Sequence, residues 1–91
     1  MLEIKPTEKF EKDIDYLNKK RRNMDELKKA IILLAEQKPI PPKYKDHQLS
    51  GEWKQYRELH ITWKPDWLLI YRIFGNQLIL QRTGSHDDLF M

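Results

Sequence analysis

Apolar residues in the first half of the chain recur at the spacing of amphipathic helices. Phe10, Ile14 and Leu17 stand at i, i+4 and i+7, and they predict a helix with one side turned to a core. Thr7 is placed to cap this helix, and the acidic residues of its first turn suit the positive end of the helix dipole. Before it, residues 2–5 alternate between apolar and charged, which is typical of a short, half-buried strand.

A second helix is predicted after the basic run at residues 19–22. It begins near Asn23, with Glu26 three positions later in the spacing of a capping box. The prolines at positions 39, 41 and 42 end any helix in this region. The buried face of this helix is predicted to consist of Met24, Leu27, Ile31 and Leu34.

The pattern changes in the second half of the chain to that of strands. Residues 43–55 are polar and contain a Ser-Gly pair, so they are predicted to form a loop. Residues 56–63 then alternate, which indicates a strand with Glu58 and His60 on the same side.

Two further strands complete the predicted sheet. Residues 67–74 are apolar on both faces, which favours a central strand. Gly75-Asn76 is typical of a hairpin turn and leads into a partner strand over residues 77–83. The order of one strand, two helices and a three-stranded meander predicts an α+β fold with the helices packed on one face of a small antiparallel sheet.

The composition fits a single cysteine-free domain that spans residues 1–91. The lack of cysteine excludes disulfides, thiolate metal sites and cysteine nucleophiles. The sequence has no apolar run long enough to span a membrane, and its first residues lack the pattern of a signal peptide. We therefore expect a cytoplasmic protein without a membrane partner.

The net charge of +3 is unevenly distributed along the chain. Residues 1–45 carry 12 basic and 8 acidic residues, whereas residues 46–91 carry 5 and 6. The first half is therefore the candidate surface for an anionic partner such as a nucleic acid.

Candidate chemistry gathers at one end of the predicted sheet. In an antiparallel meander the start of one strand lies beside the end of its neighbour, so Asp66 is expected near Arg82 and His86. His60 lies at the end of the preceding strand and is expected at the same edge. Imidazole groups, with an ordinary pKa of about 6.5, transfer protons in both directions near neutral pH.

Two histidines, an aspartate and an arginine at one edge of a sheet suit metal-free cleavage of RNA. One group takes the proton from a ribose 2′-hydroxyl, another protonates the leaving 5′-oxygen, and Arg82 stabilises the charge on phosphorus. Trp67 or Phe90 is available to stack on a base. The histidine spacing forms no short metal-binding motif, so neither a metal nor a cofactor is expected.

Each of these residues also has a structural interpretation. Arg82 can simply pair with a carboxylate, Asp66 can start a strand, and Trp67 can belong to the core. His47 stands in the predicted loop and, considered by itself, favours a structural role. For the other two histidines, the predicted proximity to Asp66 makes a catalytic role as good an interpretation as a structural one.

Several segments of the second half resemble YafQ-type toxins of the RelE/ParE superfamily. Together they cover most of residues 41–90, and their order and spacing make the resemblance specific. The segments are residues 41–51 (PPKYKDHQLSG), 53–61 (WKQYRELHI), 64–71 (KPDWLLIY) and 82–90 (RTGSHDDLF).

The resemblance implies a bacterial type II toxin with the RelE-like, microbial-ribonuclease-like fold. It implies a metal-free endoribonuclease that cleaves translated mRNA on the ribosome by attack of a 2′-hydroxyl on the adjacent phosphate. The catalytic residues that it implies are His47, His60, Asp66 and His86. The residues implied to contact or support the RNA are Trp67, Arg82 and Phe90.

The resemblance also implies a cognate acidic antitoxin of the DinJ/RelB type. A basic N-terminal half and an RNA-binding cleft should attract an acidic, partly disordered segment that wraps the toxin. DNA contacts are then expected only through the antitoxin.

One departure from the family pattern is the insertion of Thr62-Trp63 between His60 and the Pro-Asp-Trp motif. A longer loop can keep both ends of the hairpin in register, or it can displace His60 from Asp66. Two other functions stay open, and the insertion favours only the second of them. One is a ParE-like toxin that poisons a protein target such as DNA gyrase without cutting RNA, and the other is an inactive relative that only forms a regulatory complex.

Overall fold

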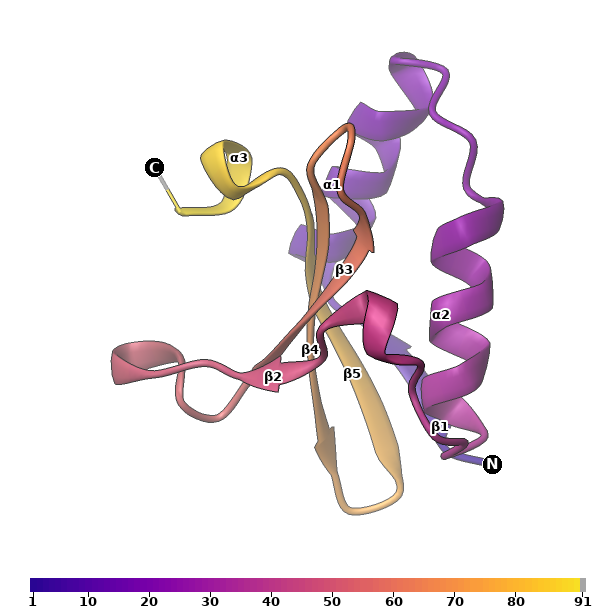
Figure 1. The fold of residues 1–91 in the computed structure, drawn as a ribbon, viewed down its shortest axis with the longest axis vertical. Coiled ribbons are helices and arrows are strands. Elements are labelled where there is room, and N and C mark those ends of the chain that lie inside the picture. The colour runs from indigo at the N-terminus through magenta and orange to yellow at the C-terminus, as the bar shows by residue number, and fades with distance from the viewer. Residues whose placement is uncertain (91) are drawn as a thin grey trace.

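The computed structural model describes residues 1–90 and has the predicted α+β architecture (Figure 1). The strands are β1 (Glu3–Pro6), β2 (His47–Gln48), β3 (Arg57–Thr62), β4 (Trp67–Phe74) and β5 (Gln77–Gly84). The helices are α1 (Glu8–Lys19), α2 (Asp25–Ala35) and α3 (His86–Phe90), with short 3₁₀ turns η1 (Pro42–Tyr44) and η2 (Gly51–Trp53).

The five strands form one sheet in the order β1-β5-β4-β3-β2. The predicted meander is confirmed, because β3, β4 and β5 pair antiparallel and β4 lies in the centre. β1 pairs parallel with β5, with Glu3 opposite Gln77, which brings the first residues of the chain to the edge of the C-terminal hairpin.

Helices α1 and α2 cover one face of the sheet, and α3 lies on the opposite side (Figure 1). Between the helices and the sheet lies the larger core, to which β3 and β4 contribute Leu59, Leu69 and Tyr71. The opposite face carries a smaller cluster in which Leu68 and Ile70 pack with Leu89 of α3. The two faces of β4 are therefore both buried, as its continuous apolar run predicts.

The predicted cap of α1 is confirmed, whereas the predicted capping box of α2 is wrong. Thr7 Oγ1 accepts a hydrogen bond from the Phe10 backbone N–H at 3.1 Å. The Asn23 side chain instead accepts from the N–H of Asp25 at 2.8 Å, two residues on, and so closes a turn before the helix. Met24 then occupies the capping position, without a side-chain acceptor.

Two short elements were not predicted from the sequence. The segment after β5 forms α3, in which Ser85 Oγ accepts a hydrogen bond from the Asp88 N–H at 3.0 Å. Part of the expected loop at residues 43–55 pairs with β3 as β2. Among the described residues, no helix combines the length and the apolar character needed to cross a bilayer.

Candidate active site

The candidate site lies on the sheet face that α1 and α2 leave uncovered. Along β3, Glu58 and His60 alternate with core residues and pair with Ile70 and Leu68 of β4, which belong to the cluster under α3. Because cross-strand partners share a face of a sheet, Glu58 and His60 point to the side of α3. β2 and α3 add further polar side chains to this face.

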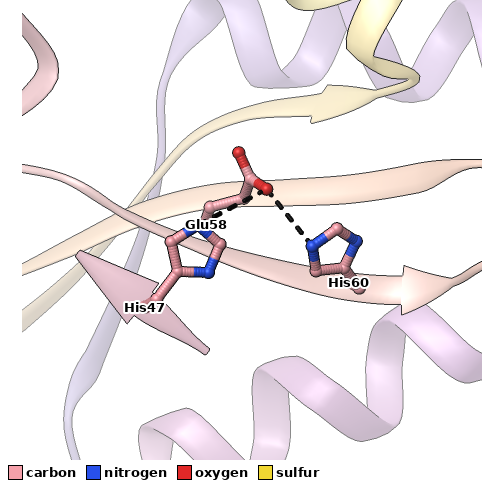
Figure 2. A group of neighbouring side chains, drawn as sticks. All are labelled: His47, Glu58 and His60. Atoms are coloured by element: carbon pink, nitrogen blue, oxygen red, sulfur yellow. Dashed lines mark ion pairs between the residues drawn. The ribbon is translucent and has the colours of Figure 1, made fainter. Parts of the chain in front are cut away.

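The carboxylate of Glu58 lies among three imidazole rings. Its Oε1 is 3.3 Å from His60 Nε2, 3.6 Å from His86 Nε2 and 3.8 Å from His47 Nε2. Figure 2 shows the contacts with His47 and His60 as dashed lines. The Glu58 residue is only 4% exposed, so this buried carboxylate depends on the imidazoles for its partners.

Glu58 was not identified as a site residue from the sequence. Its position two residues before His60 in a strand nevertheless indicates that the two side chains share a face. What singles it out is burial among three histidines. That environment requires β2 and α3, which carry His47 and His86 and were not predicted.

His86 and Asp66 form a close pair, as the meander predicts. The backbone N–H of His86 donates to Asp66 Oδ2 at 2.7 Å, and its ring Nδ1 lies 3.0 Å from the same oxygen. A carboxylate only accepts, so Nδ1 carries the hydrogen and Nε2 is turned to the cluster. Burial acts to raise the pKa of Asp66, but these hydrogen bonds from His86 outweigh it and hold the pKa below its ordinary value.

His60 is the most buried of the three imidazoles, with 7% of the residue exposed. Its ring stacks on the indole of Trp63, and burial lowers the pKa of His60 below its ordinary value despite the nearby carboxylate of Glu58. The Nδ1 atom of His60 is buried and has no hydrogen-bond partner within residues 1–90.

The inserted pair Thr62-Trp63 leaves His60 in the cluster. The register of β3 against β4 shifts between His60 and Thr62, as in a β-bulge, so the additional length is absorbed locally. The ring centroids of His60 and His86 are 5.9 Å apart, and His86 in turn contacts Asp66. Of the two outcomes left open for the insertion, the structure has the one in which His60 stays with this group.

His47 reaches the site from β2, where it pairs in register with Glu58. Its Nδ1 lies 2.7 Å from the carbonyl oxygen of Lys45, which fixes the hydrogen on Nδ1 and turns Nε2 to Glu58. Phe90 of α3 borders the same group, with its ring centroid 6.2 Å from that of His86 and 41% of the residue exposed. The structure therefore brings both residues to the face that carries Glu58 and His60.

Trp67, predicted to contact RNA, is instead a core residue. It is 2% exposed, and its indole N–H donates to Thr83 Oγ1 at 2.9 Å on the helix-covered face of the sheet. The Arg22 guanidinium lies over the ring, 5.2 Å from its centroid. No ring face is left for a base, so the prediction of stacking by Trp67 is wrong; its alternative interpretation as core is correct.

Arg82, predicted to contact the scissile phosphate, instead forms an ion pair with Asp13 of α1. Its Nε and NH2 groups donate to the two carboxylate oxygens of Asp13 at 2.7 and 3.0 Å, and Asp13 also accepts the N–H of Thr83. This bidentate pair raises the pKa of Arg82 and joins the helix to β5. The structure does not bring the guanidinium into contact with the histidines.

Three of the clustered side chains have the chemistry of a metal site. The ligand atoms of His47, Glu58 and His60 lie within 4.8 Å of one another. Two imidazole nitrogens and one carboxylate oxygen form a donor set that suits divalent copper, nickel or zinc. The residues fit such an ion if the side chains close slightly around it.

The chain is similar to known toxins over nearly its whole length. Residues 2–91 match the family model described as bacterial toxin of type II toxin-antitoxin system, YafQ. A relative from Escherichia coli strain K12, named mRNA interferase toxin YafQ, is 39% identical over 89 residues, which are 97% of this chain and 95% of the relative.

Solved structures agree with the sequence comparison. A copper-bound mutant toxin from Helicobacter pylori superposes with a TM-score of 0.93 at 39% identity, covering 99% of this chain and 100% of the other. A toxin–antitoxin complex of DinJ and YafQ from E. coli gives a TM-score of 0.87 at 38% identity, with 99% and 98% covered.

Proposed function

The chain belongs to the YafQ family of bacterial type II toxins, and from this premise we propose that it is a ribosome-dependent endoribonuclease that cleaves translated mRNA. The observation that carries the proposal is the convergence of His47, His60 and His86 on Glu58, with Asp66 behind His86. A toxin that acts only by binding a protein target needs no such set of proton-transfer groups.

In the proposed reaction His86 is the general base. Asp66 holds the hydrogen on Nδ1 and stabilises the imidazolium, so Nε2 is free to take the proton from the 2′-hydroxyl. The 2′-oxygen then bonds to the adjacent phosphorus while the bond to the 5′-oxygen breaks. The products are a 2′,3′-cyclic phosphate and a 5′-hydroxyl.

His47 is the proposed general acid. Its Nδ1 hydrogen is held by the Lys45 carbonyl, so a second proton on Nε2 is the one delivered to the leaving 5′-oxygen. Glu58, 3.8 Å from that nitrogen, stabilises the protonated ring. His60, more deeply buried, orients Glu58, and Phe90 at the rim stacks on a base.

Cell-free translation with primer extension tests this proposal. The protein should cut the message within its translated region, and a chelator selective for transition metals should leave the rate unchanged. His86→Gln should lose roughly a hundredfold or more in rate, and Asp66→Asn should lose activity in the same direction. An intact message in halted translation would overturn the nuclease proposal, and toxicity that survives His86→Gln would favour a ParE-like target instead.

We further propose an acidic antitoxin as the partner of this chain. The related E. coli toxin forms a complex with DinJ, and the N-terminal half here carries the surplus of basic residues. Co-purification with the product of an adjacent acidic gene, and rescue of growth by it, tests this.

A second property follows from the donor set of His47, Glu58 and His60. We propose that it binds a divalent transition metal, since the related toxin from H. pylori is copper-bound. In the reaction proposed above these nitrogens and the carboxylate handle protons, so a bound ion is an inhibitor rather than a cofactor.

A further inference from the structure

A basic hollow lies where β3 begins and β4 ends, and it is lined by residues from both faces of the sheet. It has a volume of about 240 Å³ and lies between the loop after β2 and the C-terminal end of β4. Lys54, Arg57 and Arg72 line it together with Tyr56, and within residues 1–90 no acidic side chain lines it. The hollow is therefore suited to an anionic group.

Arg72 and Lys54 of this hollow form no ion pair with a carboxylate among residues 1–90. Arg57 is paired with Asp46 at 3.2 Å, whereas none of the ion pairs among residues 1–90 involves Arg72. Within residues 1–90 the guanidinium of Arg72 donates only to the Gln55 side chain, at 3.2 Å, and its Nε is buried without a partner. A guanidinium has five N–H donors in a planar fork, so most of them are available to a ligand.

Two aromatic rings hold this guanidinium in place. Its central carbon lies 5.7 Å from the ring centroid of Tyr56 and 5.3 Å from that of Phe74. Such cation–π contacts orient the plane of the fork without using its N–H groups. Phe74 itself is 64% exposed, which is a large apolar surface for a strand end in contact with water.

Of the residues that line this hollow, Arg72 shares a face of the sheet with the histidine cluster. Leu68, Ile70 and Arg72 alternate along one face of β4, and Leu68 and Ile70 pair with His60 and Glu58 of β3. Two residues along a strand span about 7 Å, so Arg72 lies one such step beyond the pair that contains Glu58. A single RNA strand that occupies the cluster therefore has its next phosphate in reach of this guanidinium.

We propose that Arg72, supported by Tyr56 and Lys54, binds a phosphodiester of the RNA outside the cleaved linkage. This rests on the proposed nuclease function. The fork of Arg72 takes two oxygens of that phosphate, and the exposed ring of Phe74 contacts the attached base. The subsite binds any sequence, because phosphate contacts carry no base information, and it adds affinity for longer RNA.

Binding of short RNA, measured by fluorescence anisotropy, tests the subsite independently of cleavage. The probes are a dinucleotide and a tetranucleotide of RNA, each with a 2′-O-methyl sugar at every position so that neither can be cut. The protein should bind the tetranucleotide more tightly than the dinucleotide. Arg72→Gln should lower the affinity for the tetranucleotide about tenfold and leave the affinity for the dinucleotide unchanged.

The salt dependence of binding gives a second readout. Loss of one phosphate contact should reduce the slope of log affinity against log salt by about 0.7 for a single strand. Arg72→Lys keeps the charge, so it should retain most of the salt slope while its affinity falls. A retained slope also shows that a variant at this position folds. The matched control is Lys9→Gln, which removes an exposed cation of α1. This variant should change neither the affinity for the tetranucleotide nor the salt slope.

Two outcomes would overturn the proposal. In one, Arg72→Gln binds both oligonucleotides as the unchanged protein does. In the other, the variant keeps its affinity for the tetranucleotide but loses affinity for an oligoglutamate peptide, which assigns the hollow to an acidic protein segment. Absence of mRNA cleavage in cell-free translation bears only on the nuclease function, because this binding assay does not require it.

Discussion

The imidazole of His60 and the indole of Trp63 lie face to face, with ring centroids 4.0 Å apart and an angle of 7° between their planes. Trp63 belongs to the two-residue insertion and is itself anchored, since its Nε1–H donates to the carbonyl of Lys43 at 3.1 Å. The insertion therefore supplies one wall of the site. The indole covers the His60 ring, whose pKa burial lowers, although Trp63 is itself 53% exposed.

Replacing Trp63 should change the titration of His60. In Trp63→Ala the ring gains water on one face, so the pKa of His60 should rise toward its ordinary value of about 6.5. The measurement is an NMR titration of the imidazole ring protons, with Trp63→Phe as the control that keeps a stacking partner. An unchanged midpoint in the alanine variant would contradict the role assigned to the indole.

The stability of the fold should fall in mild acid, and His60 should account for part of this. Its pKa is lower in the folded than in the unfolded chain, so between the two values the unfolded chain binds more protons. The free energy of unfolding should therefore decrease as the pH falls below about 6.5. The pKa of Asp66 is also lowered in the folded chain, so protonation of Asp66 further decreases the free energy of unfolding at lower pH.

Urea unfolding at a series of pH values measures this dependence. In His60→Gln the decrease that begins near pH 6.5 should be smaller than in the unchanged chain, whereas the loss at lower pH should remain. If the two chains lose stability in parallel from neutral pH downward, His60 is not the group responsible.

Nickel or copper ions should slow RNA cleavage, and a chelator should restore it. Magnesium should have no such effect, since it prefers an all-oxygen ligand set over imidazole nitrogens. Loss of an outer-shell partner costs a metal site about 10–100-fold in affinity. His47→Gln, which removes a direct ligand, should therefore weaken nickel binding at least that much in calorimetry. Cleavage that stops on chelation and returns with nickel would make the ion a cofactor and contradict this expectation.

Breaking the pair between Asp13 and Arg82 should destabilise the fold without involving the site. Asp13→Ala leaves a partly buried guanidinium and the N–H of Thr83 without their acceptor. The expected loss is about 1–3 kcal/mol in the free energy of unfolding. Asp15→Ala, an exposed neighbour on α1, is the control and should be nearly neutral. Equal stabilities of the two variants would show that the bidentate pair contributes little.

Periodicity predicts the elements of this fold where a segment is long enough to show a period. The stripe of α1 and the alternation of β3 both specify which residues face the core. β2 has two residues and α3 has five, and neither length permits a periodic signal. The Ser85 cap of α3 is a local signal that could have found it, because Asp88 stands three residues later.

The site was predicted only in part, for a related reason. The neighbours of Asp66 follow from strand order, and His86 lies where that order puts it. In β4, by contrast, both faces are apolar, so the pattern does not tell which face Trp67 occupies. The partner of Arg82 is 69 residues away in the sequence, and no local pattern identifies it.

His47 and His86 are carried by two of the shortest elements of the fold. His47 lies in a two-residue strand at the edge of the sheet, and His86 begins a helix of five residues near the end of the chain. Such segments open at a far smaller cost in free energy than a central strand. A binding partner that draws either one outward separates the proton-transfer groups while the main core stays folded, so inhibition requires only local unfolding.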